Sequence, residues 1–115
     1  MGNLAELLTD ESRTEPYLRN VVRMVQALVN PAYAHTDLVR IEGHLFVVVG
    51  NGPYTYRFGV PPDERMWVAE YRNELCDPPG VWDHHGDGPL ASAEQQVVAN
   101  WIAEVAAPDL ESVDA

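Results

Sequence analysis

The sequence predicts a single α+β domain in which N-terminal helices precede a three- or four-stranded antiparallel sheet, and a C-terminal helix packs on one face of that sheet. Apolar residues recur at helical spacing near both ends of the chain, and residues 37–58 are rich in β-branched and aromatic types divided by glycines. A length of 115 residues with 46% hydrophobic residues suits one domain with a proper core. We therefore expect one domain over residues 1–115, of which 108–115 form a frayed acidic tail.

Two helices are expected before the sheet. A short one covers Leu4 to Leu8 and is interrupted by Thr9–Ser12. Thr14 then serves as the N-cap of a longer helix that has Pro16 in its first turn and ends at Asn30-Pro31. The apolar stripe of this helix, at i, i+3, i+4 and i+7 spacing, consists of Leu18, Val21, Val22, Val25, Leu28 and Val29.

Three runs, at residues 38–42, 45–49 and 54–58, are predicted to be sequential antiparallel strands. The middle run is apolar on both faces, which is typical of a central strand covered on both sides or placed at a dimer contact. Before the third run, Asn51-Gly52 is typical of a tight type I′ turn. Pro53, however, stands where the closing N–H is needed and has none to give, so we expect a wider loop.

Residues 63–75 fit two structures. As a helix, they would place Trp67, Tyr71 and Leu75 on one face. As a fourth strand, Met66–Tyr71 would alternate between two faces, with Trp67, Ala69 and Tyr71 on one of them. The strand is favoured because four of those six residues are Met, Trp, Val or Tyr and the preceding segment is a meander.

The chain is expected to finish with one more helix. Ser92 is placed to cap it, and Gln95, three residues on, would complete a capping box. Its predicted apolar face consists of Val97, Val98, Trp101, Ile102 and Val105.

The charge pattern is the strongest compositional signal. The chain has seven arginines, no lysine and eighteen acidic residues, for a formal net charge of -11. This composition resembles that of proteins from salt-in halophiles, in which molar salt screens the self-repulsion of an acidic surface. A GC-rich genome would also favour Arg over Lys, but it does not produce so large an acidic excess. An acidic surface that imitates nucleic acid is a third possibility, although it would need carboxylates clustered in rows, and here they are spread along the chain.

One loop carries a group of side chains that could bind zinc or another divalent transition metal. These candidate ligands are Cys76, Asp83, His84, His85 and Asp87. Their spacing matches no standard ligand pattern, and both adjacent histidines can reach one ion only if the neighbouring glycines let the loop curl. The alternative is a loop with exposed or hydrogen-bonded histidines that Trp82 anchors to the core.

Aromatic residues provide the candidate contact surface for a partner. We expect Trp82, Tyr54 and Tyr56 to bind a protein partner or a second copy of the chain. Direct nucleic-acid binding is disfavoured, because base-stacking sheets come with basic residues that hold the backbone. No apolar run approaches the roughly 18 residues of a membrane span, and the single Cys76 allows no internal disulfide, so a cytoplasmic location is the default expectation.

The function favoured by these patterns is that of a small non-enzymatic interaction or regulatory protein of a halophilic cytoplasm, which needs no cofactor and can dimerise through its sheet. No nucleophile pair or phosphate-binding fingerprint is recognisable. The alternative is a metal-binding protein or metal-dependent enzyme that uses the loop around Asp83, His84, His85 and Asp87. A nucleic-acid-mimicking inhibitor is the third hypothesis.

Overall fold

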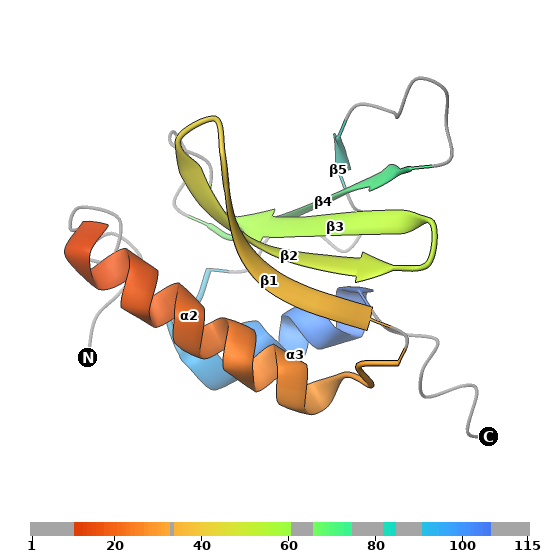
Figure 1. The fold of residues 1–115 in the computed structure, drawn as a ribbon. Helices are drawn as coiled ribbons and strands as arrows, with labels where there is room; N and C mark the ends of the chain where they lie inside the picture. Colours follow the sequence, from red (N-terminus) through yellow and green to blue (C-terminus); the bar gives the residue numbers. More distant parts are fainter. Residues whose placement is uncertain (1–10, 33, 61–65, 75–81, 85–90, 107–115) are drawn as a thin grey trace.

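The computed structural model describes residues 11–32, 34–60, 66–74, 82–84 and 91–106. The sheet order is β1-β2-β3-β4-β5 and all neighbours are antiparallel, so the predicted meander and the fourth strand are confirmed (Figure 1). A two-residue β5 extends the sheet. The predicted helix at residues 4–8 and the tail at 108–115 lie outside the described residues. The elements, in order, are α2 (Glu11–Leu28), β1 (Ala34–Ile41), β2 (His44–Asn51), β3 (Tyr54–Gly59), β4 (Val68–Asn73), β5 (Asp83–His84) and α3 (Gln95–Ala106).

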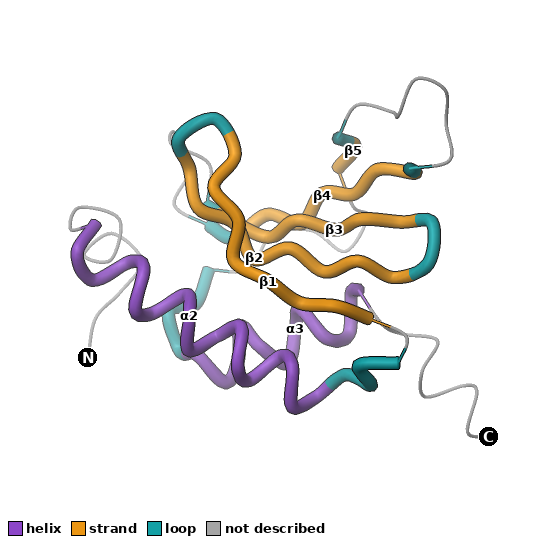
Figure 2. Tube along the Cα trace, viewed as in Figure 1, coloured by secondary structure: helices purple, strands orange, loops and turns teal. Residues whose placement is uncertain are grey.

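The core lies between one face of the sheet and the two helices, which run side by side below that face in the view of Figure 2. In β2, Val47 and Val49 point to the helices and are fully buried, whereas Phe46 and Val48, which alternate with them, are half-buried. Phe58 pairs with Val47 across the sheet and is also fully buried. Period-2 alternation therefore gives the sheet one helix-covered face and one face that neither described helix covers.

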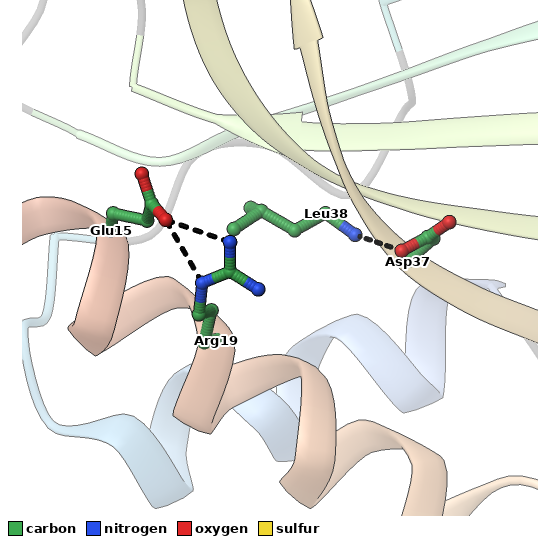
Figure 3. A network of polar contacts seen from close by, with 4 residues as sticks. All are labelled: Glu15, Arg19, Asp37 and Leu38. Atoms are coloured by element: carbon green, nitrogen blue, oxygen red, sulfur yellow. Dashed lines mark hydrogen bonds and ion pairs between the residues drawn. The ribbon is translucent and has the colours of Figure 1, made fainter.

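α2 begins earlier than predicted. It starts at Glu11, so Thr14 lies inside the helix and is not its N-cap, and Pro16 is an internal residue. Pro16 removes only one backbone hydrogen bond, and an ion pair between Arg19 and Glu15 (2.7 Å) flanks it (Figure 3). The predicted stripe is buried except for Leu28, the last residue of α2, which is 48% exposed.

The two hairpin turns are both two residues long. Between β1 and β2, Glu42 and Gly43 have φ values of 51° and 86°, as a type I′ turn requires. Between β2 and β3, the expected wider loop is wrong, because Asn51 pairs with Tyr54 and leaves Gly52-Pro53 as the central pair. In this frame the closing N–H belongs to Tyr54, so the missing N–H of Pro53 has no cost, and Gly52 supplies the positive φ of 61°.

The predicted capping box of α3 is not formed. The Ser92 hydroxyl accepts a hydrogen bond from the Glu94 N–H (3.1 Å), and the Gln95 side chain reaches across to α2. There it accepts from Asn20 Nδ2 (2.7 Å) and donates to the Tyr17 carbonyl (3.3 Å). A tertiary partner has thus replaced the local one. The buried face of α3 is Val98, Ala99, Ile102, Val105 and Ala106, while Val97 is 38% exposed.

The segment before α3 is held by two aromatic residues. The Tyr17 hydroxyl donates to the Ala93 carbonyl (2.7 Å), and Trp67 Nε1 donates to the Ser92 carbonyl (2.9 Å). The two rings stack with centroids 6.4 Å apart. Burial raises the pKa of Tyr17 to about 12, so its hydroxyl remains a neutral donor at neutral pH. These contacts tie the chain before α3 to both α2 and the sheet.

Thr36 is the buried polar side chain whose removal should stabilise the protein. It is 8% exposed, and its Oγ1 has no hydrogen-bond partner among the described residues. Thr36→Val keeps the shape and removes the unsatisfied hydroxyl, so we expect the free energy of unfolding to rise by about 1 kcal/mol in denaturant titrations. Thr36→Ser, which keeps the hydroxyl and loses the methyl group, should destabilise instead. A loss of stability in Thr36→Val would mean that the hydroxyl has a partner.

Candidate functional site: the open face of the sheet

We use the name open face for the surface of the sheet opposite α2 and α3 (Figure 1). Strand register assigns alternate residues of each strand to it, and Trp82 joins them through its ring contacts. Its described residues are His35, Asp37, Val39, Ile41, His44, Phe46, Val48, Gly50, Thr55, Arg57, Gly59, Val68, Glu70, Arg72, Glu74 and Trp82.

At the centre of the open face, arginine and aromatic side chains alternate in a stack. Cζ of Arg57 lies 4.8 Å from the Phe46 ring centroid and 4.4 Å from the Trp82 ring centroid. On the other side, Cζ of Arg72 lies 4.6 Å from the Trp82 ring. We call Phe46, Arg57, Trp82 and Arg72 the arginine–aromatic stack. Cation–π attraction is strongest where water is excluded, and the Arg57 side chain is only 15% exposed.

Each arginine of the stack also has a carboxylate partner. Arg57 Nε donates to Glu70 Oε1 (2.9 Å), its direct cross-strand neighbour, and Arg72 Nε donates to Glu74 Oε2 (2.8 Å). Hydrogen bonds from the Thr55 side chain and from Arg72 hold the pKa of Glu74 below its usual value. Both guanidinium charges are therefore compensated within the face itself.

Gly59 allows the stack to approach the backbone. A Cβ placed on Gly59 would lie 2.5 and 2.8 Å from Cδ1 and Cε1 of Phe46, so the ring occupies the space that a side chain would need. Gly59 is buried although it lies on the open face. The requirement for glycine here comes from close packing, since Gly59 has no positive φ.

The outer edge of β1 is blocked in part, at three of its backbone groups. The two-residue turn makes Ile41 and His44 a hydrogen-bonded pair, so the N–H and C=O groups of Ala34, Thr36, Leu38 and Arg40 point away from β2. The Ala34 N–H donates to the Asn30 carbonyl (3.0 Å), and Gln26 Nε2 donates to the Thr36 carbonyl (3.1 Å).

The third blocked group is the Leu38 N–H, which donates to Oδ1 of the adjacent Asp37 (2.8 Å; Figure 3). Three of the eight outward N–H and C=O groups are thus bonded within the chain, which makes this edge a weaker template for another strand.

The predicted partner-binding residues are divided between the two faces. Trp82 lies in the arginine–aromatic stack, whereas Tyr54 and Tyr56 lie on the helix-covered face, where both contact Tyr71. The centroid distances to Tyr71 are 6.3 Å for Tyr54 and 6.1 Å for Tyr56. Tyr54 is 40% exposed, while Tyr56 packs against the core.

The predicted metal ligands are only partly within the described residues. Asp83 and His84 form β5, in register with Tyr71 and Glu70. Cys76, His85 and Asp87 lie outside the described residues. Within the described part of the chain, no group of three or more His, Cys, Asp or Glu side chains could hold a metal ion, and the zinc site stays a prediction. Over the same ranges, no helix is long and apolar enough to cross a membrane.

Sequence reasoning did not select Arg57, Glu70 and Arg72, although a signal for them was present. Arg57 alternates with the aromatic residues of its strand, and Glu70 and Arg72 alternate with Ala69 and Tyr71 in β4. If β3 and β4 are paired as neighbouring antiparallel strands, Arg57, Arg72 and Glu70 fall on one face of the sheet.

The chemical character of the site is that of a contact surface. Flat rings and guanidinium planes cover the centre, and half-buried aliphatic residues, Val39, Ile41, Val48 and Val68, surround it. No protein-family model matches the chain, and no curated protein or solved structure is significantly similar to it.

Proposed function

We propose that the protein is a non-enzymatic interaction module and that its open face is the binding surface. The observation that carries the proposal is the arginine–aromatic stack on a sheet face that neither described helix covers. Aromatic residues and arginine are the types enriched at protein interfaces, where Trp and Arg often dominate the binding energy. The stack holds these side chains rigidly, which lowers the entropy lost on binding.

We further propose that the module works in a salt-rich cytoplasm. The net charge of -11 and the absence of lysine support this environment. At molar salt the Debye length is about 3 Å, so acidic surfaces repel one another little and contact between apolar surfaces decides association. An interaction surface that relies on rings and aliphatic side chains suits such a solvent.

The proposal is tested by quantitative affinity capture at molar KCl with two matched variants. Val39→Glu places a charge on the open face, whereas Val97→Glu places the same charge on α3, where Val97 is 38% exposed. We expect Val39→Glu to reduce the captured partner about tenfold and Val97→Glu to leave it unchanged. Circular dichroism verifies that both variants are folded. Equal capture by both variants and the parent chain would overturn the open face as the binding surface.

A further inference from the structure

We propose that the open face recognises a carboxylate of its partner, an aspartate or glutamate side chain, through the Nη groups of Arg72. This inference rests on the proposed function, because it names the chemistry that the bound partner presents. It is carried by the hydrogen-bond donors that Arg72 has left, by the contacts that fix its guanidinium group and by the local charge.

Arg72 retains donors that the described residues do not use. A guanidinium group has five N–H donors, and among the described residues only Nε of Arg72 has a partner, Oε2 of Glu74 at 2.8 Å. Arg19 on α2 differs, since it gives both Nε (3.0 Å) and Nη2 (2.7 Å) to Glu15. Within the described ranges, the buried side-chain polar atom without a partner is Thr36 Oγ1, so the Nη atoms of Arg72 reach solvent. A ligand can therefore bind them.

The guanidinium group of Arg72 is held in place before a ligand binds. The Trp82 ring centroid lies 4.6 Å from its Cζ, and Arg57 holds the same ring with its Cζ at 4.4 Å. Glu74, which binds Nε of Arg72, also accepts a hydrogen bond from Thr55, the cross-strand neighbour of Arg72. An arginine that is already ordered loses less conformational entropy on binding than a mobile one.

The Nη pair of Arg72 matches a carboxylate in shape and in charge. Its two parallel N–H groups fit the two oxygens of a planar carboxylate, and charge-assisted bonds of this kind are roughly twice as strong as neutral ones. The two arginines of the stack and their two glutamate partners give 2 − 2 = 0. A carboxylate therefore brings this group to −1, whereas a phosphate dianion would bring it to −2 and be repelled more by the glutamates.

An acidic side chain suits this site better than a chain terminus. Terminal carboxylates are typically captured by consecutive backbone N–H groups, whereas acidic motifs are recognised by arginine side chains, as here. Half-buried apolar residues of the same face, among them Val48 and Val68, can pack against apolar neighbours of the acidic residue. The net charge of -11 repels an acidic partner at long range, but in molar salt this repulsion acts over only about 3 Å.

The test is an NMR titration of the isotopically labelled full chain in molar KCl, followed at the Nε–H signals of Arg72 and Arg19. The probes are N-acetyl-glutamate α-amide, its neutral analogue N-acetyl-glutamine α-amide, and inorganic phosphate. We expect the glutamate probe to shift the Arg72 signal saturably. Its dissociation constant should be at least about tenfold lower than those of the glutamine probe and phosphate at Arg72, and than its own at Arg19.

A pair of matched variants extends the test to the partner. Arg72→Lys keeps the charge but loses the planar fork, and the side chain is 36% exposed, so we expect this variant to fold. It should reduce the partner captured in molar KCl about fivefold or more. Arg23→Lys makes the same change at an exposed position of α2 and should leave capture unchanged. Circular dichroism verifies that both variants are folded.

The outcomes separate this inference from the proposed function. Equal shifts of Arg72 with the glutamate and glutamine probes, or tighter binding of phosphate, would overturn the carboxylate assignment. If Val39→Glu nevertheless loses the captured partner, the open face remains the binding surface and uses other contacts. If the glutamate probe binds at Arg72 while Val39→Glu captures as much partner as the parent chain, the proposed function fails and the carboxylate site stands.

Discussion

An increase in KCl from dilute to molar concentration should raise the unfolding temperature of this protein by about 10 °C. The compact state holds a net charge of -11, and its self-repulsion is relieved when the chain unfolds and the charges separate. At 0.1 M salt the screening length is about 10 Å, and at 1 M it is about 3 Å, so the repulsion acts mainly at low salt. Recovery of about 2 kcal/mol corresponds to a shift of roughly 10 °C in a domain of this size.

The control for this prediction is pH. Near the isoelectric point of about 4.5 the net charge disappears, and the same increase in KCl should shift the unfolding temperature much less. Thermal scans followed by circular dichroism measure the KCl-induced shift in unfolding temperature at both pH values. Salt strengthens apolar burial at both, so the difference between the two shifts reports the charge effect. A chain that is equally stable in dilute and molar KCl at neutral pH would refute the proposed adaptation to salt.

The substitution Gly59→Ala should destabilise the protein by about 1–3 kcal/mol, because the new methyl group would overlap the Phe46 ring. Two ring carbons lie 2.5 and 2.8 Å from the Cβ position, and a ring that moves away from Gly59 must also shift against Arg57. The effect is measured as the free energy of unfolding in denaturant titrations. Alanine normally stabilises a strand relative to glycine, so the sign of the change is diagnostic.

Gly50→Ala is the matched control, since Gly50 lies in the adjacent β2 and a Cβ there meets nothing within 4 Å. We expect Gly50→Ala to be neutral or slightly stabilising. In a Phe46→Leu background, the smaller side chain should reduce the cost of Gly59→Ala to less than about 1 kcal/mol, and the double-mutant cycle gives the coupling between the two sites. Equal costs in both backgrounds would show that the Phe46 ring does not impose the glycine.

Most of the fold could be predicted because it follows from periodicity. The helical stripe from Leu18 to Val29 is set by which residues must leave water, and the structure buries all of it except Leu28. The three predicted strand runs also form strands, as β1, β2 and β3. β4 was the ambiguous case. Its residues could also have formed a helical face with Trp67 and Tyr71. They form a strand because they pair with the edge of the neighbouring β3 along its whole length.

The errors fall where a local signal competes with a distant partner or with register. Gln95 had the spacing for a capping box, but Asn20 and the Tyr17 carbonyl, from the other end of the chain, bind its amide. Gly52-Pro53 forms a tight turn because pairing of Asn51 with Tyr54 moves the turn one residue along. Neither the distant partner of Gln95 nor the shift of the turn can be read from the residues next to the capping box or the turn.

The candidate site was only partly predictable for the same reason. Trp82 was recognised as a contact residue, but its position over Arg57 and Arg72 depends on how the chain returns to β4 after residues outside the described ranges. The pairing of Arg57 with Glu70 follows from strand register alone and was within reach of the sequence. The blocked edge was not, because Gln26 reaches Thr36 only after α2 has packed beside β1.

The order of elements along the chain also determines when the β1 edge is bonded and when the apolar sheet face is covered during synthesis. α2 and β1 are made first, so the contacts that occupy the β1 edge, all between residues 26 and 38, can form before the rest of the sheet exists. The helix α3, whose Trp101 ring meets Phe58 at 5.4 Å, is complete only 106 − 59 = 47 residues after β3 ends. At about 5–20 residues per second, a ribosome takes roughly 2–9 s to add them. During those seconds the nascent sheet has a partly occupied edge but an incompletely covered apolar face, which is the surface a chaperone would meet.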